Sequence, residues 1–133
     1  MNNWDYAASI PTGDFRGAMT LPREYSLREV DGEVRVIQTP VAALQELRRE
    51  HFSAAGVEID EGALRAPLKG KALEIVAVFD AAGASAEEFG VKLRVGAGEE
   101  TLVGYDVAAG EAFVDRTNSG FLPSEAFAAR HGA

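Results

Sequence analysis

The stretch FGVKLRVGAGEETLVGYDVAAGEAFVDRTNSG, residues 89–120, contains three short apolar runs separated by glycine-containing segments. The runs FGVKLRV, TLVGYDV and EAFVD begin at residues 89, 101 and 111. Short strand-like runs at intervals of about 8 to 12 residues are typical of antiparallel sandwiches and barrels. We therefore predict three strands in this stretch and an all-β architecture for the chain.

A hairpin is predicted upstream of this stretch. The runs YSLREV and VRVIQ, residues 25–30 and 34–38, are separated by Asp31 and Gly32. An Asp-Gly pair accepts the positive φ angles that a type I′ turn requires, so it is a strong hairpin signal.

One helix and two more strands are expected between the hairpin and residue 89. The segment VAALQELRREHF, residues 41–52, carries apolar residues at helical spacing and begins just after a proline, which predicts a helix. VEI at 57–59 and ALEIVAVF at 72–79 read as strands. ALEIVAVF has one fully apolar face and one partly apolar face, as a strand between two sheets would have.

Residues 1–22 favour an irregular segment, because prolines and glycines punctuate them every few residues. We expect this segment to precede a β-sandwich module over residues 23–133. The expected fold class is therefore all-β, an antiparallel β-sandwich with one short helix after the first hairpin.

Composition limits the classes of function. The net charge is −8, from 13 Lys and Arg against 21 Asp and Glu. Nucleic-acid binding requires clustered positive charge, so neither a nucleic acid nor an anionic membrane surface is an expected partner. The chain has no cysteine, which excludes disulfides, thiolate metal sites and cysteine nucleophiles. The first residues do not resemble a secretory signal, and the compartment is left open.

The sequence offers few candidates for catalytic residues. The two histidines, His51 and His131, have no His/Asp/Glu cluster beside them in the sequence, so neither a metal site nor any other cofactor is expected. Glycosidases need two carboxylates that face one substrate. Acidic pairs here are adjacent, for example Asp60-Glu61 and Glu99-Glu100, and neighbouring strand residues point to opposite faces. A solvated surface is the favoured interpretation of these pairs.

Asp115 and Arg116 are the one charged pair at the end of an apolar run. As a functional site, Arg116 would bind an anionic or polyol ligand. As a structural lock, one of the two side chains would hold the following segment TNSG against a neighbouring strand by a charge-assisted hydrogen bond. With no histidine or third carboxylate nearby in the sequence, we favour the structural lock.

Many ordered matches resemble glycoside hydrolase family 32, the invertases, levanases and inulinases. The N-terminal part matches the family pattern where the catalytic β-propeller leads into the C-terminal β-sandwich, through NNWDYA (2–7), PT (11–12), FRGAMTLPREY (15–25), DG (31–32) and PV (40–41). FVDRTNSG, residues 113–120, resembles a segment of the sandwich. The family's catalytic motifs, W-x-N-D-P-N-G, R-D-P and E-C, do not occur in this sequence.

The resemblance implies a non-catalytic β-sandwich portion of a sucrose- or fructan-hydrolysing enzyme, with a packing and stabilising role and no activity alone. It implies that the chain starts at the closing edge of the propeller and stops before the last sandwich strands. The partner would be the propeller domain or a second copy of the chain. Asn2, Asn3 and Trp4 match a segment near the mouth of the active-site funnel, so they are the expected contacts to a fructose-containing saccharide. A free-standing carbohydrate-binding or oligomerisation module is the alternative.

Overall fold

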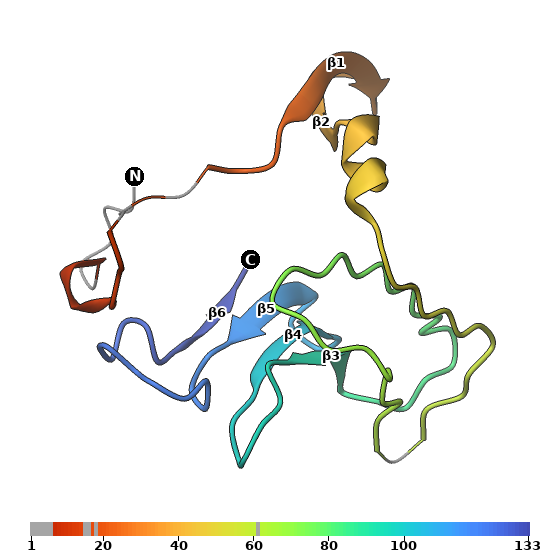
Figure 1. Cartoon of the computed structure of the whole chain (residues 1–133). Helices are drawn as coiled ribbons and strands as arrows, with labels where there is room; N and C mark the ends of the chain where they lie inside the picture. The colour runs from red at the N-terminus through yellow and green to blue at the C-terminus, as the bar shows by residue number, and fades with distance from the viewer. Residues whose placement is uncertain (1–6, 15–16, 18, 61) are drawn as a thin grey trace. The chain divides into compact units, whose positions relative to one another are not determined.

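The computed structural model describes residues 7–14, 17, 19–60 and 62–133. These residues fall into two compact units, Thr20–Val78 and a second unit formed by the described part of Met1–Met19 with Phe79–Ala133. Strands and short 3-10 helices are the regular elements (Figure 1). The expected all-β, antiparallel class is confirmed, whereas the expected division after residue 22 stays a prediction. In the described part of the chain, no helix is long and apolar enough to cross a membrane.

The predicted hairpin forms in the Thr20–Val78 unit. β1 (Arg23–Val30) pairs antiparallel with β2 (Glu33–Pro40). The turn residues Asp31 and Gly32 have φ angles of 54° and 79°, the positive values that a type I′ turn requires.

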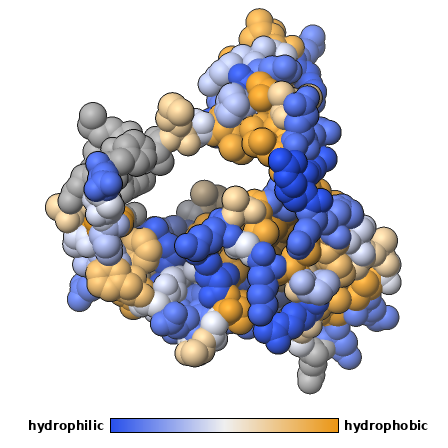
Figure 2. All heavy atoms as spheres, in the orientation of Figure 1, coloured by the Kyte–Doolittle hydropathy of each residue, from blue (hydrophilic) through white to orange (hydrophobic). Residues whose placement is uncertain are grey.

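The pairing register groups four apolar or aromatic side chains on one face of the hairpin, together with Glu29 and Gln38. Leu27 lies opposite Val36, and Tyr25 and Val34 share the face of this pair. All four side chains are exposed, and apolar atoms gather over the hairpin surface (Figure 2). The opposite face carries charged side chains, including Arg28 opposite Arg35.

The predicted helix is shorter and tighter than expected. A 3-10 helix, η2 (Ala42–Leu47), replaces the helix predicted over residues 41–52. Arg48 already has an extended backbone, and no side chain caps the helix at Val41. The apolar face that the spacing predicted is not buried, since Leu47 is exposed. A short helix without tertiary packing is marginal in water, which accounts for the early end.

Two predicted strands are wrong. VEI (57–59) and ALEIVAVF (72–79) form no β-ladder in the structure. Val76 and Val78 are 81% and 93% exposed. Alternating apolar residues predict an extended, half-buried backbone, but a strand also needs a hydrogen-bonded neighbour, and none pairs with these segments.

A four-stranded antiparallel sheet dominates the Phe79–Ala133 part. Its order is β3 (Glu88–Leu93), β4 (Thr101–Asp106), β5 (Glu111–Asp115) and β6 (Arg130–Gly132). The first three confirm the strands predicted from residues 89–115. β6 was not predicted, because its sequence RHG has no apolar alternation and is set in place by backbone pairing with β5.

The two faces of this sheet differ in character. Val91, Val103 and Val114 lie in register on one face, and the rings of Phe79 and Tyr105 lie 5.1 and 5.7 Å from that of Phe89. The opposite face carries acidic residues, two glycines and Phe113, a pattern that follows from the period-2 alternation of side chains.

Phe113 is the one buried hydrophobic side chain among the described residues, at 6% exposure. Gly104, its partner on the neighbouring strand β4, makes room for it. A Cβ at Gly104 would lie 2.7 Å from Cζ of Phe113. At Gly90, on β3, a Cβ would instead meet the backbone of β4, 2.5 Å from the Gly104 Cα. The aromatic ring therefore packs where the neighbouring strand has no side chain.

Candidate functional site

Asp115 lies at the end of β5, where the chain leaves the sheet. Its Oδ1 accepts a hydrogen bond from the Thr117 hydroxyl at 2.7 Å and one from the Thr117 backbone N–H at 2.9 Å. These bonds close an Asx-type turn directly after the strand. They also stabilise the charged carboxylate, so the Thr117 hydroxyl and backbone N–H lower the pKa of Asp115.

Residues 117–120 are tied to the connection between β3 and β4. The Asn118 side-chain amide donates to the carbonyl of Gly98 at 2.6 Å, and the Asn118 carbonyl accepts the Glu100 N–H at 2.8 Å. The hydroxyls of Ser119 and Thr101 are hydrogen-bonded at 2.7 Å. Asn118 and Ser119 thus hold one loop against the other, a role that we did not assign to them from the sequence.

Arg116 makes its contacts with the segment that precedes β6. Its backbone N–H donates to the Ala129 carbonyl at 3.1 Å, which extends the pairing of β5 with β6. Its guanidinium carbon lies 4.4 Å from the centroid of the Phe127 ring, within the range of a cation–π interaction. Asp115 and Arg116 are therefore adjacent in sequence but bind different parts of the chain.

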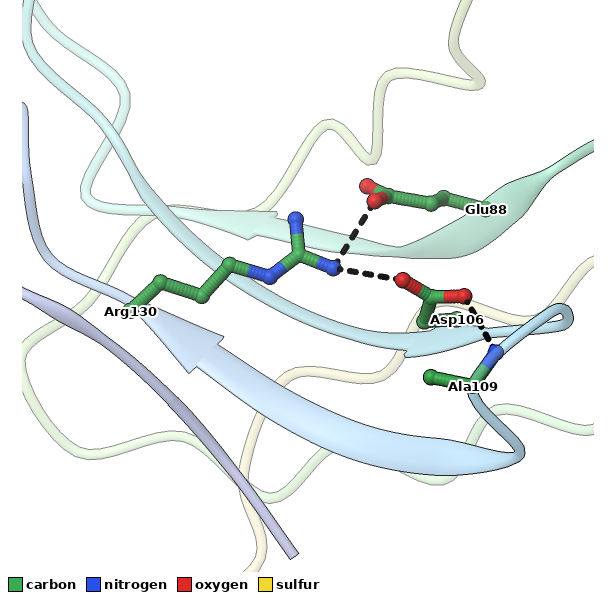
Figure 3. A network of polar contacts seen from close by, with 4 residues as sticks. All are labelled: Glu88, Asp106, Ala109 and Arg130. Atoms are coloured by element: carbon green, nitrogen blue, oxygen red, sulfur yellow. Dashed lines mark hydrogen bonds and ion pairs between the residues drawn. The ribbon is translucent and has the colours of Figure 1, made fainter.

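Arg130, on β6, forms a second charged cluster on the face of the sheet that carries Phe113. Its Nη2 donates to Glu88 on β3 at 2.8 Å and to Asp106 on β4 at 3.3 Å (Figure 3). Its guanidinium carbon also lies 3.7 Å from the centroid of the Phe113 ring on β5. One side chain from the edge strand therefore contacts all three other strands.

The carboxylates of this cluster are engaged within the chain. Asp106 Oδ1 accepts the Ala109 N–H at 2.9 Å in the turn after β4, while its Oδ2 faces Arg130 (Figure 3). Hydrogen bonding to Glu88 raises the pKa of Arg130. The cluster can join strands, but its two carboxylates share a cation instead of facing an open cleft. Sequence reasoning missed it because nothing near Arg130 in the chain indicates partners 24 and 42 residues away.

The remaining candidates have different outcomes. Asn2, Asn3 and Trp4 lie outside the described residues. Both histidines are exposed, His131 on β6 and His51 after η2. In the described ranges, no group of three or more His, Cys, Asp and Glu side chains forms a metal site.

The described strands form two antiparallel sheets, and charged contacts join the strands of the larger sheet. Residues 43–133 match a family described as glycosyl hydrolases family 32, C terminal. The chain therefore belongs to this family, and the match lies in the family's C-terminal domain.

Individual relatives agree with this assignment. The chain is similar to a levanase of Bacillus subtilis, with 40% identity over 122 residues, which are 90% of this chain and 18% of the relative. It is also similar to an extracellular exo-inulinase of Aspergillus niger, with 36% identity over 124 residues, 90% of this chain and 23% of the relative. The chain thus spans less than a quarter of the length of these relatives.

A solved structure confirms the fold. The crystal structure of an exo-inulinase from Aspergillus awamori matches all of this chain and 26% of its own, with a TM-score of 0.68 and 28% identity. The predicted β-sandwich class and the resemblance to glycoside hydrolase family 32 are both confirmed.

Proposed function

We propose that this chain is the supporting domain of a fructan-hydrolysing enzyme and stabilises the catalytic domain by packing against it. The observation that carries the proposal is the match of residues 43–133 to the family's C-terminal domain. Relatives with levanase and exo-inulinase activity in their names extend the similarity to 90% of the chain. Residues 1–22 would then be the connection to the catalytic propeller, and 23–133 the module itself.

The contacts of three carboxylates, those of Asp115, Glu88 and Asp106, support a structural role for the chain. Glycoside hydrolysis requires two carboxyl groups that face one substrate. Asp115 accepts both of its hydrogen bonds from Thr117, and Glu88 and Asp106 share Arg130. Each of these groups fixes the chain's own backbone or strands.

Asp115 and Arg116 act as the structural lock in this proposal. Asp115 fixes the first turn of the loop after β5, and Arg116 holds the segment before β6 through the Ala129 carbonyl and the Phe127 ring. Asn2, Asn3 and Trp4 are proposed sugar contacts because they resemble a family segment near the mouth of the active-site funnel. This role requires the propeller, which forms that funnel. A fructose-containing saccharide is the ligand class that it implies.

A free-standing carbohydrate-binding or oligomerisation module is not favoured. Sugar-binding surfaces present aromatic faces with convergent polar groups. Tyr25 and Phe121 are exposed aromatic residues, but they belong to different units and neither has a ring contact among the described residues. Phe79 and Tyr105 are also exposed and flank the Phe89 ring, but in the hollow that they line the Tyr105 hydroxyl is the one polar side-chain group among the described lining residues.

The test is a chimera. In the Bacillus subtilis levanase, the segment that matches this chain is either deleted or replaced by residues 1–133. Fructose release from levan is measured after incubation at increasing temperatures. We expect the chimera to keep its activity at temperatures that inactivate the deletion variant, because burial of apolar surface against the domain stabilises the catalytic part.

A matched chimera carrying Gly104→Val is the control, since its side chain would collide with the Phe113 ring and disrupt the sheet. We expect this variant to inactivate like the deletion variant. A chimera no more heat-resistant than the deletion variant would contradict a supporting role.

A further inference from the structure

The turn of the β1–β2 hairpin carries a reactive pair, Asp31 and Gly32. Asp31 is the only aspartate of the sequence that is followed by glycine. A backbone nitrogen can attack the carboxyl carbon of the aspartate that precedes it, and a side chain on the attacking residue hinders this approach. Gly32 has no side chain, and both residues of the pair are exposed. The turn therefore combines an accessible carboxyl group with an unhindered backbone nucleophile.

Neither reacting group is held by the rest of the described chain. The Asp31 carboxylate forms no hydrogen bond or ion pair with a described residue, and the Gly32 N–H donates to none of them. Val30 pairs with Glu33 and closes the hairpin on either side of the turn. The polar groups of Asp31 and Gly32 are thus left outside this pairing.

Asp106, at the end of β4, shows the opposite arrangement. Its Oδ1 accepts the Ala109 N–H at 2.9 Å. The nitrogen that would attack its carboxyl carbon, that of Val107, donates to the Glu87 carbonyl at 3.0 Å. Both the carboxyl group and the nucleophile are therefore engaged.

Asp115, at the end of β5, is held in the same way. Its Oδ1 accepts hydrogen bonds from the hydroxyl and the backbone N–H of Thr117. The nitrogen of Arg116, the residue that follows, donates to the Ala129 carbonyl at 3.1 Å. At Asp106 and Asp115 hydrogen bonds must break before the nitrogen reaches the carboxyl carbon, so these two residues are internal standards for Asp31.

We propose that Asp31 is a site of spontaneous isoaspartate formation, and that this modification loosens the hairpin. The Gly32 nitrogen forms a bond to Cγ of the protonated Asp31 carboxyl group and loses its proton, while a carboxyl oxygen leaves as water. Water then adds to the main-chain carbonyl carbon of Asp31 in the resulting succinimide, and the bond from this carbon to the Gly32 nitrogen breaks. The main chain now runs through Cβ and Cγ. The water released in the first step is consumed in the second, so the mass is unchanged.

Isomerisation changes the hairpin because it lengthens the connection. A methylene group enters the main chain of a two-residue turn whose φ angles, 54° and 79°, match type I′. Turn type and loop length fix the register of a hairpin. The pairing of Leu27 with Val36 should therefore weaken in the modified chain.

Prolonged incubation of the folded 133-residue chain, followed by proteolysis and mass spectrometry with electron-transfer fragmentation, tests the proposal. Fragmentation locates isoaspartate at each residue. A methyltransferase specific for isoaspartate provides a second readout, since it transfers the methyl group of S-adenosylmethionine to the free α-carboxylate. Isoaspartate at Asp31 should accumulate at least about tenfold faster than at Asp106 or Asp115, where hydrogen bonds must open first. Comparable rates at the three sites would overturn the proposal.

The same incubation in guanidinium chloride separates the effect of the fold from that of the glycine. Unfolding frees the two standards, so the rates at Asp106 and Asp115 should rise about tenfold. The rate at Asp31 should stay within about threefold of its value in the folded chain, because no opening is needed there. A rise at Asp31 as large as that at Asp106 would mean that the turn protects the site, and the proposal would be wrong.

Asp31→Gly is the matched control for the effect on the hairpin. It removes the reactive carboxyl group and keeps the turn, since glycine accepts the φ angle of 54° at that position. During incubation, the nuclear Overhauser effects between Leu27 and Val36 should decline in the unaltered chain in step with its isoaspartate content. They should stay constant in Asp31→Gly. An equal decline in both chains, or full intensity in a chain with an isomerised turn, would contradict the loosening of the hairpin.

Discussion

Gly104 on β4 lies opposite Phe113 on β5, and the missing side chain at position 104 leaves room for the aromatic ring. The phenyl ring occupies the space that a Cβ at position 104 would fill. This packing buries Phe113 beneath the Arg130 guanidinium. The sequence identified both residues only as part of strands, because the pairing register that brings them together is a property of the folded sheet.

Replacing Gly104 by alanine should destabilise the sheet. The new methyl group would lie 2.7 Å from the Phe113 ring and 2.8 Å from the Phe89 carbonyl oxygen, so one of them must move. Overpacking of this kind lowers the free energy of unfolding by about 1–3 kcal/mol. Urea unfolding followed by circular dichroism measures the loss.

Gly96→Ala is the control, because a Cβ at Gly96 meets no atom within 4 Å. Its expected change is within about 0.5 kcal/mol. Equal stabilities of the two variants would contradict the packing of Phe113 on Gly104.

Asp115 should contribute stability in a pH-dependent way. The Thr117 hydrogen bonds lower its pKa in the folded state, so its contribution is fully present above the pKa of the unfolded chain, near 3.8. It is lost as the pH falls through the lower folded pKa. Asp115→Ala should cost roughly 1 kcal/mol at pH 7, with a smaller difference below about pH 4.

Urea unfolding at several pH values measures this difference. Asp115→Asn keeps a side-chain oxygen for Thr117 without a charge, so its own contribution should not vary with pH. The difference in the free energy of unfolding between the unaltered chain and Asp115→Ala should shrink as the pH falls. If it stays constant from pH 7 to pH 2.5, the charged hydrogen bond is not its cause.

At the scale of elements, turn residues and short apolar runs predicted the strands correctly where paired strands are neighbours in sequence. The Asp31-Gly32 turn and the strands at 88–93, 101–106 and 111–115 required only short-range patterns. The segments at 57–59 and 72–79 carry the same kind of pattern but have no ladder partner, and pattern alone cannot supply one. β6 shows the converse, a strand created by a partner without any pattern of its own.

The hairpin gives a prediction at this scale. Gly32→Ala places a side chain at a φ angle of 79°, which costs about 1–2 kcal/mol for a residue other than glycine. An isolated two-stranded hairpin is marginal, so the nuclear Overhauser effects between Leu27 and Val36 should weaken markedly.

Signals of the β3–β6 sheet are expected to stay in place in this variant, because the turn belongs to the other unit. Asp31→Gly is the control, since glycine accepts the φ angle of 54° at that position. Retention of the Leu27–Val36 effects at full intensity in Gly32→Ala would argue against a type I′ turn.

For the whole molecule, the sequence predicted the family and the class of fold through ordered motifs, and the family match and the structural match confirm both. The candidate site was only partly accessible. Asp115 was visible as a charged residue at the end of a strand, whereas Asn118, Ser119 and Arg130 act through partners that are distant in sequence. Long-range polar contacts depend on the fold, so they could not be predicted from local pattern.

The most direct measurement is fructose release by the purified 133-residue chain from levan, inulin and sucrose, with the Bacillus subtilis levanase as positive control. A supporting domain without catalytic carboxylates predicts release no greater than that of buffer with each substrate. Turnover above this background that is abolished by a single Asp or Glu substitution in the chain would contradict the account.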